Sequence, residues 1–243
     1  MNASLVALTV SAAVLAVGTT STPTPTVRLA SSASAPPVVP FEFSRIYWEY
    51  NRSANDLGVH VTLDGEDWTR LKIESPQDRT LFLVQGRGPY GSLGMTELFF
   101  EGAEPSLEEF PLADLLALFP EGEYEFEGVT VDGAAIEGEH RFSHAIPDGP
   151  RVFTDVGSNF SVRIRWNEVS SPPPGFPNRP IHISGYQVIV EPTFQVTLPA
   201  SSRSVTVPPE FVQSLGSGVQ KFEVLAIERS GNQTLTEGTF VLP

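Results

Sequence analysis

The side chains best suited to bind a ligand are oxygen donors gathered between positions 49 and 67. They are Glu49, Asn51, Asn55, Asp56, Asp64, Glu66 and Asp67. Calcium takes about six to eight hard oxygen ligands, which loops at the edge of a β-sandwich can supply. The sequence therefore suggests a calcium site anchored on Asp56, Asp64 and Asp67, although the spacing differs from the EF-hand loop. Because Asp56 and Asp64 flank one predicted strand at opposite ends, they share an ion only if another loop intervenes. Two solvated turns that use Asn, Asp and Gly for backbone reasons explain the same residues.

Three glutamates alternate along one predicted strand, Glu123, Glu125 and Glu127. Residues two apart on a strand share a face and lie about 7 Å from each other. A cation or an arginine-rich partner could use this stripe. A solvated face that protects an edge strand from aggregation explains the same pattern.

Five aromatic side chains of the first half could form a platform on which sugar rings stack. They are Tyr47, Trp48, Tyr50, Trp68 and Tyr90. Aromatic residues on strands usually belong to the core, and we assign Trp48 and Tyr50 there. Trp68 shares a predicted strand face with Arg70 and Lys72, so we expect it to be exposed or at a contact between domains, and we take it as the candidate ligand-binding residue.

No group of residues forms a recognisable catalytic motif. The histidines are His60, His140, His144 and His182, and no motif pairs any of them with a nucleophile. His140 and His144 would lie about 13 Å apart on a strand, too far to bind one metal. Ser92 stands in a segment that lacks the first Gly of a nucleophile elbow. We therefore expect no catalytic residue, no cofactor and no enzyme activity. A hydrolase that uses the many carboxylates stays open as a further reading.

The composition is that of an acidic chain without thiol chemistry. Its 243 residues include 22 Pro, 20 Gly and no Cys, which favours many turns and excludes disulfides and thiolate metal sites. Residues 41–148 hold 22 Asp and Glu against 7 Lys and Arg, whereas residues 149–243 hold 7 of each. A strongly acidic surface repels phosphate backbones and anionic membranes, so nucleic acid is not an expected partner.

The first 40 residues predict export. Leu5–Val17 is an uncharged run of about the length of a signal-peptide core, too short to span a bilayer. Residues 18–40 are rich in Thr, Ser, Pro and Ala, a composition that does not fold by itself. We assign residues 1–35 to a signal peptide, with cleavage near Ala30 or Ala33 as the alternative, and residues 36–40 to a linker. Because no Cys follows, we expect no lipid anchor, and the lack of disulfides favours a bacterial exported protein.

Between residues 41 and 148 the pattern predicts strands and one helix. Apolar and polar residues alternate over 59–63 and 71–73, the period of half-buried strands. Apolar residues at helical spacing over 112–119 predict a short helix, and a strand follows at 123–128. Pro and Gly on both sides place a domain boundary at 147–150.

Three segments of the C-terminal part stand in a recognisable order. They are Ile164-Arg165-Trp166, Ile183-Ser184-Gly185-Tyr186-Gln187-Val188 and Phe222–Gly231. A Trp that ends one strand, a Gly-Tyr-x-Val about 20 residues later and a hydrophobic strand that runs into a Gly-containing hairpin resemble a fibronectin type III domain over residues 150–243. The resemblance implies two packed antiparallel sheets with Trp166 in the core. The Tyr that usually opens the sixth strand of this family is absent, and no Arg-Gly-Asp tripeptide occurs.

These patterns predict an all-β protein of two tandem β-sandwich domains. Residues 41–148 form an acidic β-rich domain with a short helix before its late strands, and residues 149–243 form the fibronectin type III-like domain. The resemblance implies a fold that binds and spaces more often than it catalyses, although fold alone does not give function. We therefore expect an exported, non-catalytic interaction or spacer module that is periplasmic, secreted or on the cell surface, with a protein or polysaccharide partner and no membrane span in the mature chain. The alternative is a carbohydrate-binding accessory protein that uses exposed aromatic residues of the first domain.

Overall fold

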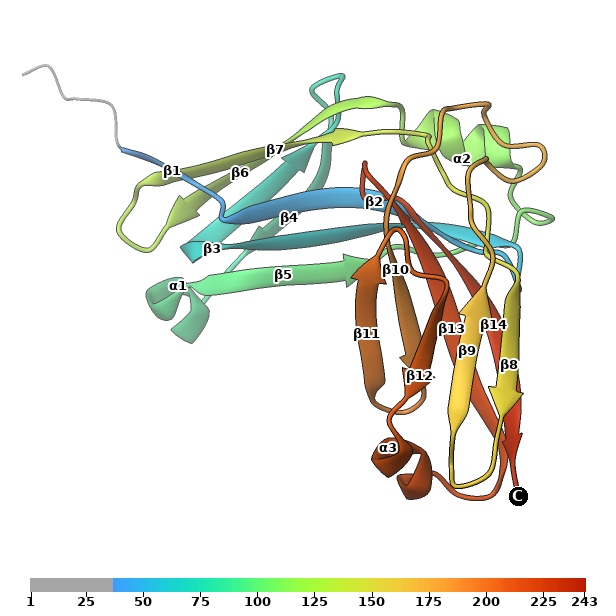
Figure 1. Cartoon of the computed structure of the whole chain (residues 1–243). Coiled ribbons are helices and arrows are strands. Elements are labelled where there is room, and N and C mark those ends of the chain that lie inside the picture. The colour runs from blue at the N-terminus through green and yellow to red at the C-terminus, as the bar shows by residue number, and fades with distance from the viewer. Residues whose placement is uncertain (1–36) are drawn as a thin grey trace, which may run out of the picture. The chain divides into compact units, whose positions relative to one another are not determined.

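The computed structural model describes residues 37–243 (Figure 1). The predicted signal peptide at residues 1–35 lies outside the described residues. Pro36–Pro243 forms one compact unit. Its described part contains fourteen strands and three short helices, which confirms the predicted all-β fold. None of the described helices is long and apolar enough to cross a membrane.

The strands belong to two sheets. The first half of the described chain contains β1 (Val38–Pro40), β2 (Phe43–Asn51), β3 (Asp56–Glu74), β4 (Thr80–Gln85), α1 (Pro89–Leu93), β5 (Met95–Glu101), α2 (Leu112–Leu118), β6 (Gly122–Thr130) and β7 (Ala135–Phe142). The second half contains β8 (Val152–Val156), β9 (Val162–Trp166), β10 (Ile183–Val190), β11 (Phe194–Pro199), β12 (Ser204–Val207), α3 (Pro209–Ser214), β13 (Gly218–Glu228) and β14 (Gln233–Leu242). Eleven strands from both halves form one sheet, and β12, β9 and β8 form a second sheet of three strands.

Strand β3 is 19 residues long because it serves two parts of the large sheet. Its first part pairs with β2 and β5, and its second part pairs with β6 and β4. The register shifts between Asp64 and Trp68, so the acidic segment 64–67 is the corner at which β3 changes partners. Gly65 fits this corner because a Cβ there would lie 2.9 Å from Cδ1 of Phe41.

The first hydrophobic core contains the apolar residues of the two alternating stretches that the sequence predicts to be strands. The apolar residues of the two alternating stretches are all buried, namely Val59, Val61, Leu63, Leu71 and Ile73. They share one cluster with Trp48, Phe126 and Phe142. The predicted helix is confirmed as α2, which begins after Pro111 and contributes the buried Leu115 to this cluster.

The second half has the predicted fibronectin type III or immunoglobulin-like fold. One sheet has the order β12-β9-β8, and the strands of the large sheet that complete the sandwich have the order β14-β13-β10-β11. Trp166 is 4% exposed, and its ring centroid lies 5.5 Å from that of Tyr186. The Tyr186 hydroxyl accepts a hydrogen bond from the Val169 N–H at 3.1 Å. A core tyrosine on β10 therefore fixes a loop, although the tyrosine usual on the sixth strand is absent.

Continuous β-structure connects the two cores. β14 pairs in parallel with β2, with Gln233–Leu235 opposite Glu49–Asn51 (Figure 1). The connecting segment at 145–150 is buried except for Asp148, which is partly exposed. The main chain between the two cores is therefore packed inside the unit.

Part of the segment that the sequence assigned to a linker is ordered. Val38–Pro40 forms β1 and pairs in parallel with Ala135–Glu137 of β7. Backbone groups at the free edge of a sheet accept any extended segment, whatever its side chains. Composition alone therefore could not show this pairing.

Candidate functional site

Strands β2 and β3 bring polar side chains onto one face of the sheet. Their register sets Tyr47 opposite His60 and Glu49 opposite Gly58. Side chains that lie directly opposite each other, or two residues apart, point to the same face. Tyr47, Glu49 and His60 therefore share one face, whereas Trp48 points to the core.

Two glutamates complete the group, one at the end of β5 and one in the loop that follows it. Glu101 lies directly opposite the histidine in the β3–β5 register. The next loop folds back over β3, where the Gly102 N–H donates to the Val59 carbonyl at 2.8 Å. A Cβ at Gly58 would lie 2.4 Å from Cγ of Glu104. The missing side chain at position 58 thus leaves the space that Glu104 occupies.

The imidazole of His60 lies at the centre of this group. Its Nε2 is 2.9 Å from Oε1 of Glu104 and 4.0 Å from Oε1 of Glu101. Its Nδ1 is 3.5 Å from the hydroxyl of Tyr47. The His60 side chain is 5% exposed, whereas those of Glu104 and Glu101 are 26% and 53% exposed. The buried ring is therefore separated from solvent by carboxylates.

Glu49 extends the group toward the second half of the chain. Its carboxylate accepts a hydrogen bond from the side-chain amide of Gln233 on β14. One carboxylate oxygen of Glu49, one ring nitrogen of His60 and one carboxylate oxygen of Glu104 all lie within 4.8 Å of one another. We call these three residues the Glu49–His60–Glu104 group. One nitrogen and two oxygen donors can hold a divalent cation.

Burial and charge act in opposite directions on this group. Burial raises the pKa of the Glu49 carboxyl above its ordinary value; His60 and the bond from Gln233 oppose this rise, and Glu104 and Glu101 add to it. Burial acts to lower the pKa of His60, but the hydrogen bond to Glu104 and the charges of Glu49, Glu104 and Glu101 outweigh it, so this pKa is raised. The surroundings of the ring therefore favour positive charge at its position.

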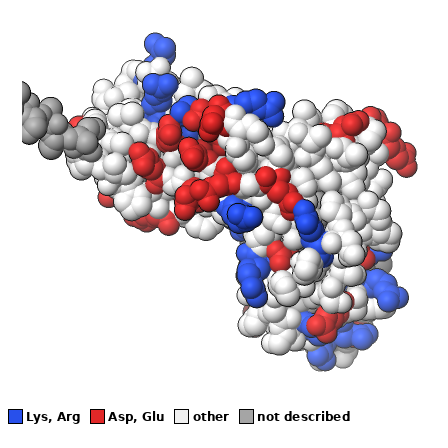
Figure 2. Space-filling model, turned by 90° about the horizontal axis from the view of Figure 1, so that it is seen from above, with Lys and Arg blue, Asp and Glu red and all other residues white. Residues whose placement is uncertain are grey.

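The predicted glutamate stripe lies on β6 and faces solvent. Glu125 and Glu127 bring carboxylate oxygens within 4.8 Å of one from Glu74 on β3. Nζ of Lys72 lies 2.7 Å from the carboxylates of both Glu74 and Glu127. Figure 2 shows Asp and Glu side chains gathered on the face seen from above, with Lys and Arg among them. This second group thus already contains a cationic side chain.

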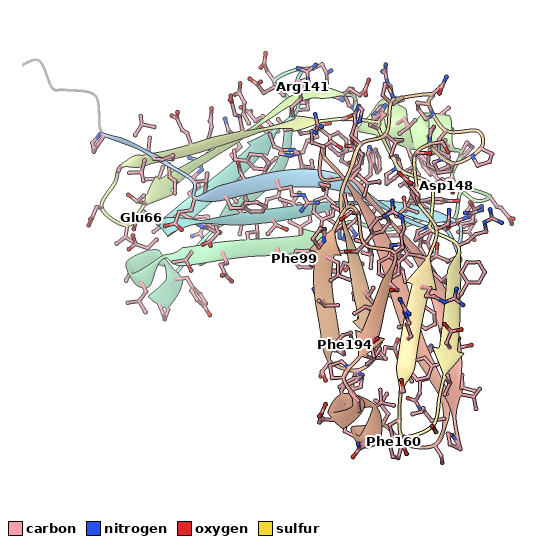
Figure 3. The ribbon with its side chains drawn as sticks, in the orientation of Figure 1. Glu66, Phe99, Arg141, Asp148, Phe160 and Phe194 are labelled. Carbon is pink, nitrogen blue, oxygen red and sulfur yellow. The ribbon has the colours of Figure 1, made fainter. Side chains whose placement is uncertain are left out.

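The predicted calcium ligands lie at different points of β3. Asp56 begins the strand, and Asp64 and Asp67 stand at its corner, about 26 Å further along at the rise of an extended chain. Figure 3 shows Glu66 at this corner and Asp148 at the connection between the two halves. The structure does not bring Asp56 and Asp64 together. Among the described residues, the two groups whose donor atoms are close enough to hold a metal ion contain neither of them.

The asparagines of the same stretch form the turn between β2 and β3. The side-chain oxygen of Asn51 accepts hydrogen bonds from the backbone N–H groups of Ser53 and Ala54 at 2.9 and 3.1 Å. Asn55 has a φ of 58°, which Asn tolerates better than most residues. The structure therefore supports the interpretation that Asn51 and Asn55 serve the backbone of a turn.

Trp68 is buried, which corrects the expectation that it is exposed. Its side chain is 0% exposed and belongs to the first core. The register of β3 with β6 shifts between Trp68 and Arg70, so strict alternation fails there and the two residues do not share a face. Trp48, Tyr50 and Tyr47 are buried as well, and Tyr90 is exposed. The five aromatic residues therefore form no stacking platform.

The Glu49–His60–Glu104 group was not predicted from the sequence. The alternation over 59–63 puts His60 on the polar face of a predicted strand, and this is the one signal that the sequence offers. The partners of His60 depend on the β2–β3 register and on the loop after β5, and no local pattern reveals either.

No protein-family model and no curated protein sequence matches the chain. A segment of two fibronectin type III domains from chicken tenascin is similar at 10% identity, over 83% of this chain and 99% of that segment, with a TM-score of 0.28. A bacterial ice-binding adhesin is similar at 13% identity, over 82% of this chain and 63% of the other, with a TM-score of 0.28. The spore cortex lytic enzyme SleM of Clostridium perfringens is similar at 16% identity, over 40% of this chain and 28% of the enzyme, with a TM-score of 0.30. Likenesses at these identities and TM-scores say nothing about what this chain does.

Proposed function

We propose that this chain is an exported, non-catalytic interaction or spacer module that presents its two sandwich cores as a single rigid unit. The observation that carries the proposal is the eleven-stranded sheet, which passes from the first core to the second through the pairing of β2 with β14. Tandem domains move relative to each other by default unless a large contact holds them. A shared sheet is such a contact.

Side-chain hydrogen bonds between the two halves also support a single rigid unit. Asn232 is 0% exposed. Its side-chain oxygen accepts from the Trp48 N–H at 2.9 Å, and its amide nitrogen donates to the carbonyls of Ser143 and Ala145 at 2.7 and 3.1 Å. One residue of the second half thus bonds to a core strand of the first half and to the connecting segment.

Arg52 holds the other side of the connecting segment. It donates to the Gly149 carbonyl at 2.8 Å and lies 3.2 Å from the Asp148 carboxylate. The hydroxyl of Thr234 donates to the Pro147 carbonyl at 2.5 Å. A spacer built in this way keeps its two cores at a fixed position relative to each other.

Limited proteolysis tests the rigid unit. Because the segment at 145–150 is buried and hydrogen-bonded, thermolysin or subtilisin under native conditions is expected to leave it intact. Early cleavage at this segment, with release of two stable halves, would show two independent domains.

Export and the lack of catalysis need separate measurements. Expression of the full chain in a bacterial host, followed by N-terminal sequencing of the periplasmic product, is expected to show loss of about the first 35 residues. An intact N-terminus in the cytoplasm counts against export.

A screen for hydrolysis of polysaccharides and peptidoglycan tests the lack of catalysis and is expected to be negative. Hydrolysis that Glu49→Gln or Glu104→Gln abolishes would replace the proposal with an enzyme.

A further inference from the structure

We propose that the Glu49–His60–Glu104 group binds a divalent metal cation of the zinc or manganese class. The three donor atoms lie within 4.8 Å of one another. Ligands of such an ion stand about 2.0–2.2 Å from it, so two of them are at most about 4.4 Å apart. The upper bound of 4.8 Å in this group exceeds that limit by only about 0.4 Å.

The group is held in place by the sheet. His60 lies in the middle of β3, and the Tyr47 hydroxyl is 3.5 Å from its Nδ1, the nitrogen that does not face Glu104. Gln233 donates to the Glu49 carboxylate. Ligands in metal sites are commonly oriented by such partners, and here both partners come from neighbouring strands.

Charge favours a cation at this position. Three carboxylates, those of Glu49, Glu101 and Glu104, surround one imidazole. The guanidinium of Arg45 lies over the neighbouring Tyr47 ring, 4.1 Å from its centroid. Even with this charge and a protonated His60 ring, the three carboxylates leave an excess of negative charge. Glu104 and Glu101 are partly open to solvent, at 26% and 53% exposure, so an ion can enter from that side.

The donor set selects the class of ion. Calcium and magnesium prefer oxygen ligands, whereas a buried imidazole nitrogen among carboxylates suits zinc, manganese or iron. The group of Glu74, Glu125 and Glu127 offers an internal comparison, because it contains oxygen donors only and Lys72 already lies 2.7 Å from two of its carboxylates. This inference does not rest on the proposed function, and either can fail alone.

The test is metal binding by the chelator-treated full chain. Calorimetric titration with ZnCl₂ or MnCl₂ is expected to show one site, and CoCl₂ is expected to give visible absorption bands that report nitrogen and oxygen ligation. A 100-fold excess over the dissociation constant is expected to raise the melting temperature by about 5 °C or more. CaCl₂ and MgCl₂ at matched ionic strength are expected to do much less.

Variants distinguish this site from adventitious binding. His60→Gln and Glu104→Gln are expected to weaken zinc binding at least about tenfold. Gly58→Ala keeps every ligand but displaces Glu104, and it is expected to weaken binding as well. The matched controls are Glu125→Gln in the lysine-paired group and His182→Gln, whose histidine is exposed; both are expected to bind zinc as the parent does.

The proposal is overturned if zinc and cobalt do not bind, or if Glu104→Gln, with an unchanged circular dichroism spectrum, binds them as the parent does. Glu104 stands in a loop, so this variant is expected to fold even if His60→Gln does not. Equal losses in the Glu125→Gln and His182→Gln controls would show surface binding only and would likewise reject the site.

Discussion

Trp68 and Trp166 are equivalent in burial although they belong to different cores. Trp68 is 0% exposed and Trp166 is 4% exposed. Truncating a buried Trp removes its burial energy and leaves a cavity, which costs about 3–5 kcal/mol. We predict that Trp68→Ala and Trp166→Ala each lower the free energy of unfolding by this amount in urea denaturation.

Tyr90→Ala is the control for this pair, since Tyr90 is 63% exposed. Its effect is expected to stay within about 0.5 kcal/mol. A loss below about 1 kcal/mol at Trp68 would show that its ring is not part of the core.

The two tryptophans also show what can be read from single residues. Trp166 follows the regular alternation of β9, so its burial could be predicted from the sequence. Trp68 follows a corner and a register shift, where counting residues in twos assigns the wrong face. The Glu49–His60–Glu104 group likewise cannot be predicted by counting along one strand, because its members come from two strands and a loop.

At the scale of elements, the turn from β13 into β14 is bonded to the first half of the chain through Asn232. Replacing Asn232 with Ala removes the partners of one buried N–H and two carbonyls. A buried polar group without a partner costs about 1–3 kcal/mol. We predict that Asn232→Ala lowers the free energy of unfolding by about 2–4 kcal/mol in urea denaturation.

Thr239→Ala on β14, the strand that follows Asn232, is the matched control, because Thr239 is exposed. Its effect is expected to stay within about 0.5 kcal/mol. Equal and small effects at both positions would mean that the bonds of Asn232 do not hold the two halves together.

Element type was easier to predict than element pairing. The helical spacing over 112–119 and the alternation over 59–63 and 71–73 each describe a local period, and α2 and β3 follow them. The sequence shows no local period for two of the pairings. That 59–63 and 71–73 belong to one bent strand, and that β2 pairs with β14 184 residues further along the chain, depends on long-range contacts.

At the scale of the whole molecule, charge is concentrated in the first half. Residues 41–148 carry 22 acidic and 7 basic residues, and like charges repel in the compact state. The Debye length falls from about 30 Å at 0.01 M salt to about 8 Å at 0.15 M. We predict that NaCl raises the melting temperature of the chelator-treated chain over this range, measured by circular dichroism. A fall with added salt would show that ion pairs outweigh the repulsion.

Calcium separates this general effect from a site on Asp56, Asp64 or Asp67. These carboxylates are spread along β3, so calcium and magnesium at matched ionic strength are expected to shift the melting temperature alike. A rise of several degrees with millimolar calcium alone, lost in Asp56→Asn or Asp64→Asn, would establish the calcium site.

Whether the two cores act as one unit is tested most directly by differential scanning calorimetry of the full chain. A continuous sheet and a buried connecting segment predict a single transition in which the calorimetric and van 't Hoff enthalpies agree. Two resolved transitions, or a calorimetric enthalpy about twice the van 't Hoff value, would contradict the rigid unit and leave two independent domains.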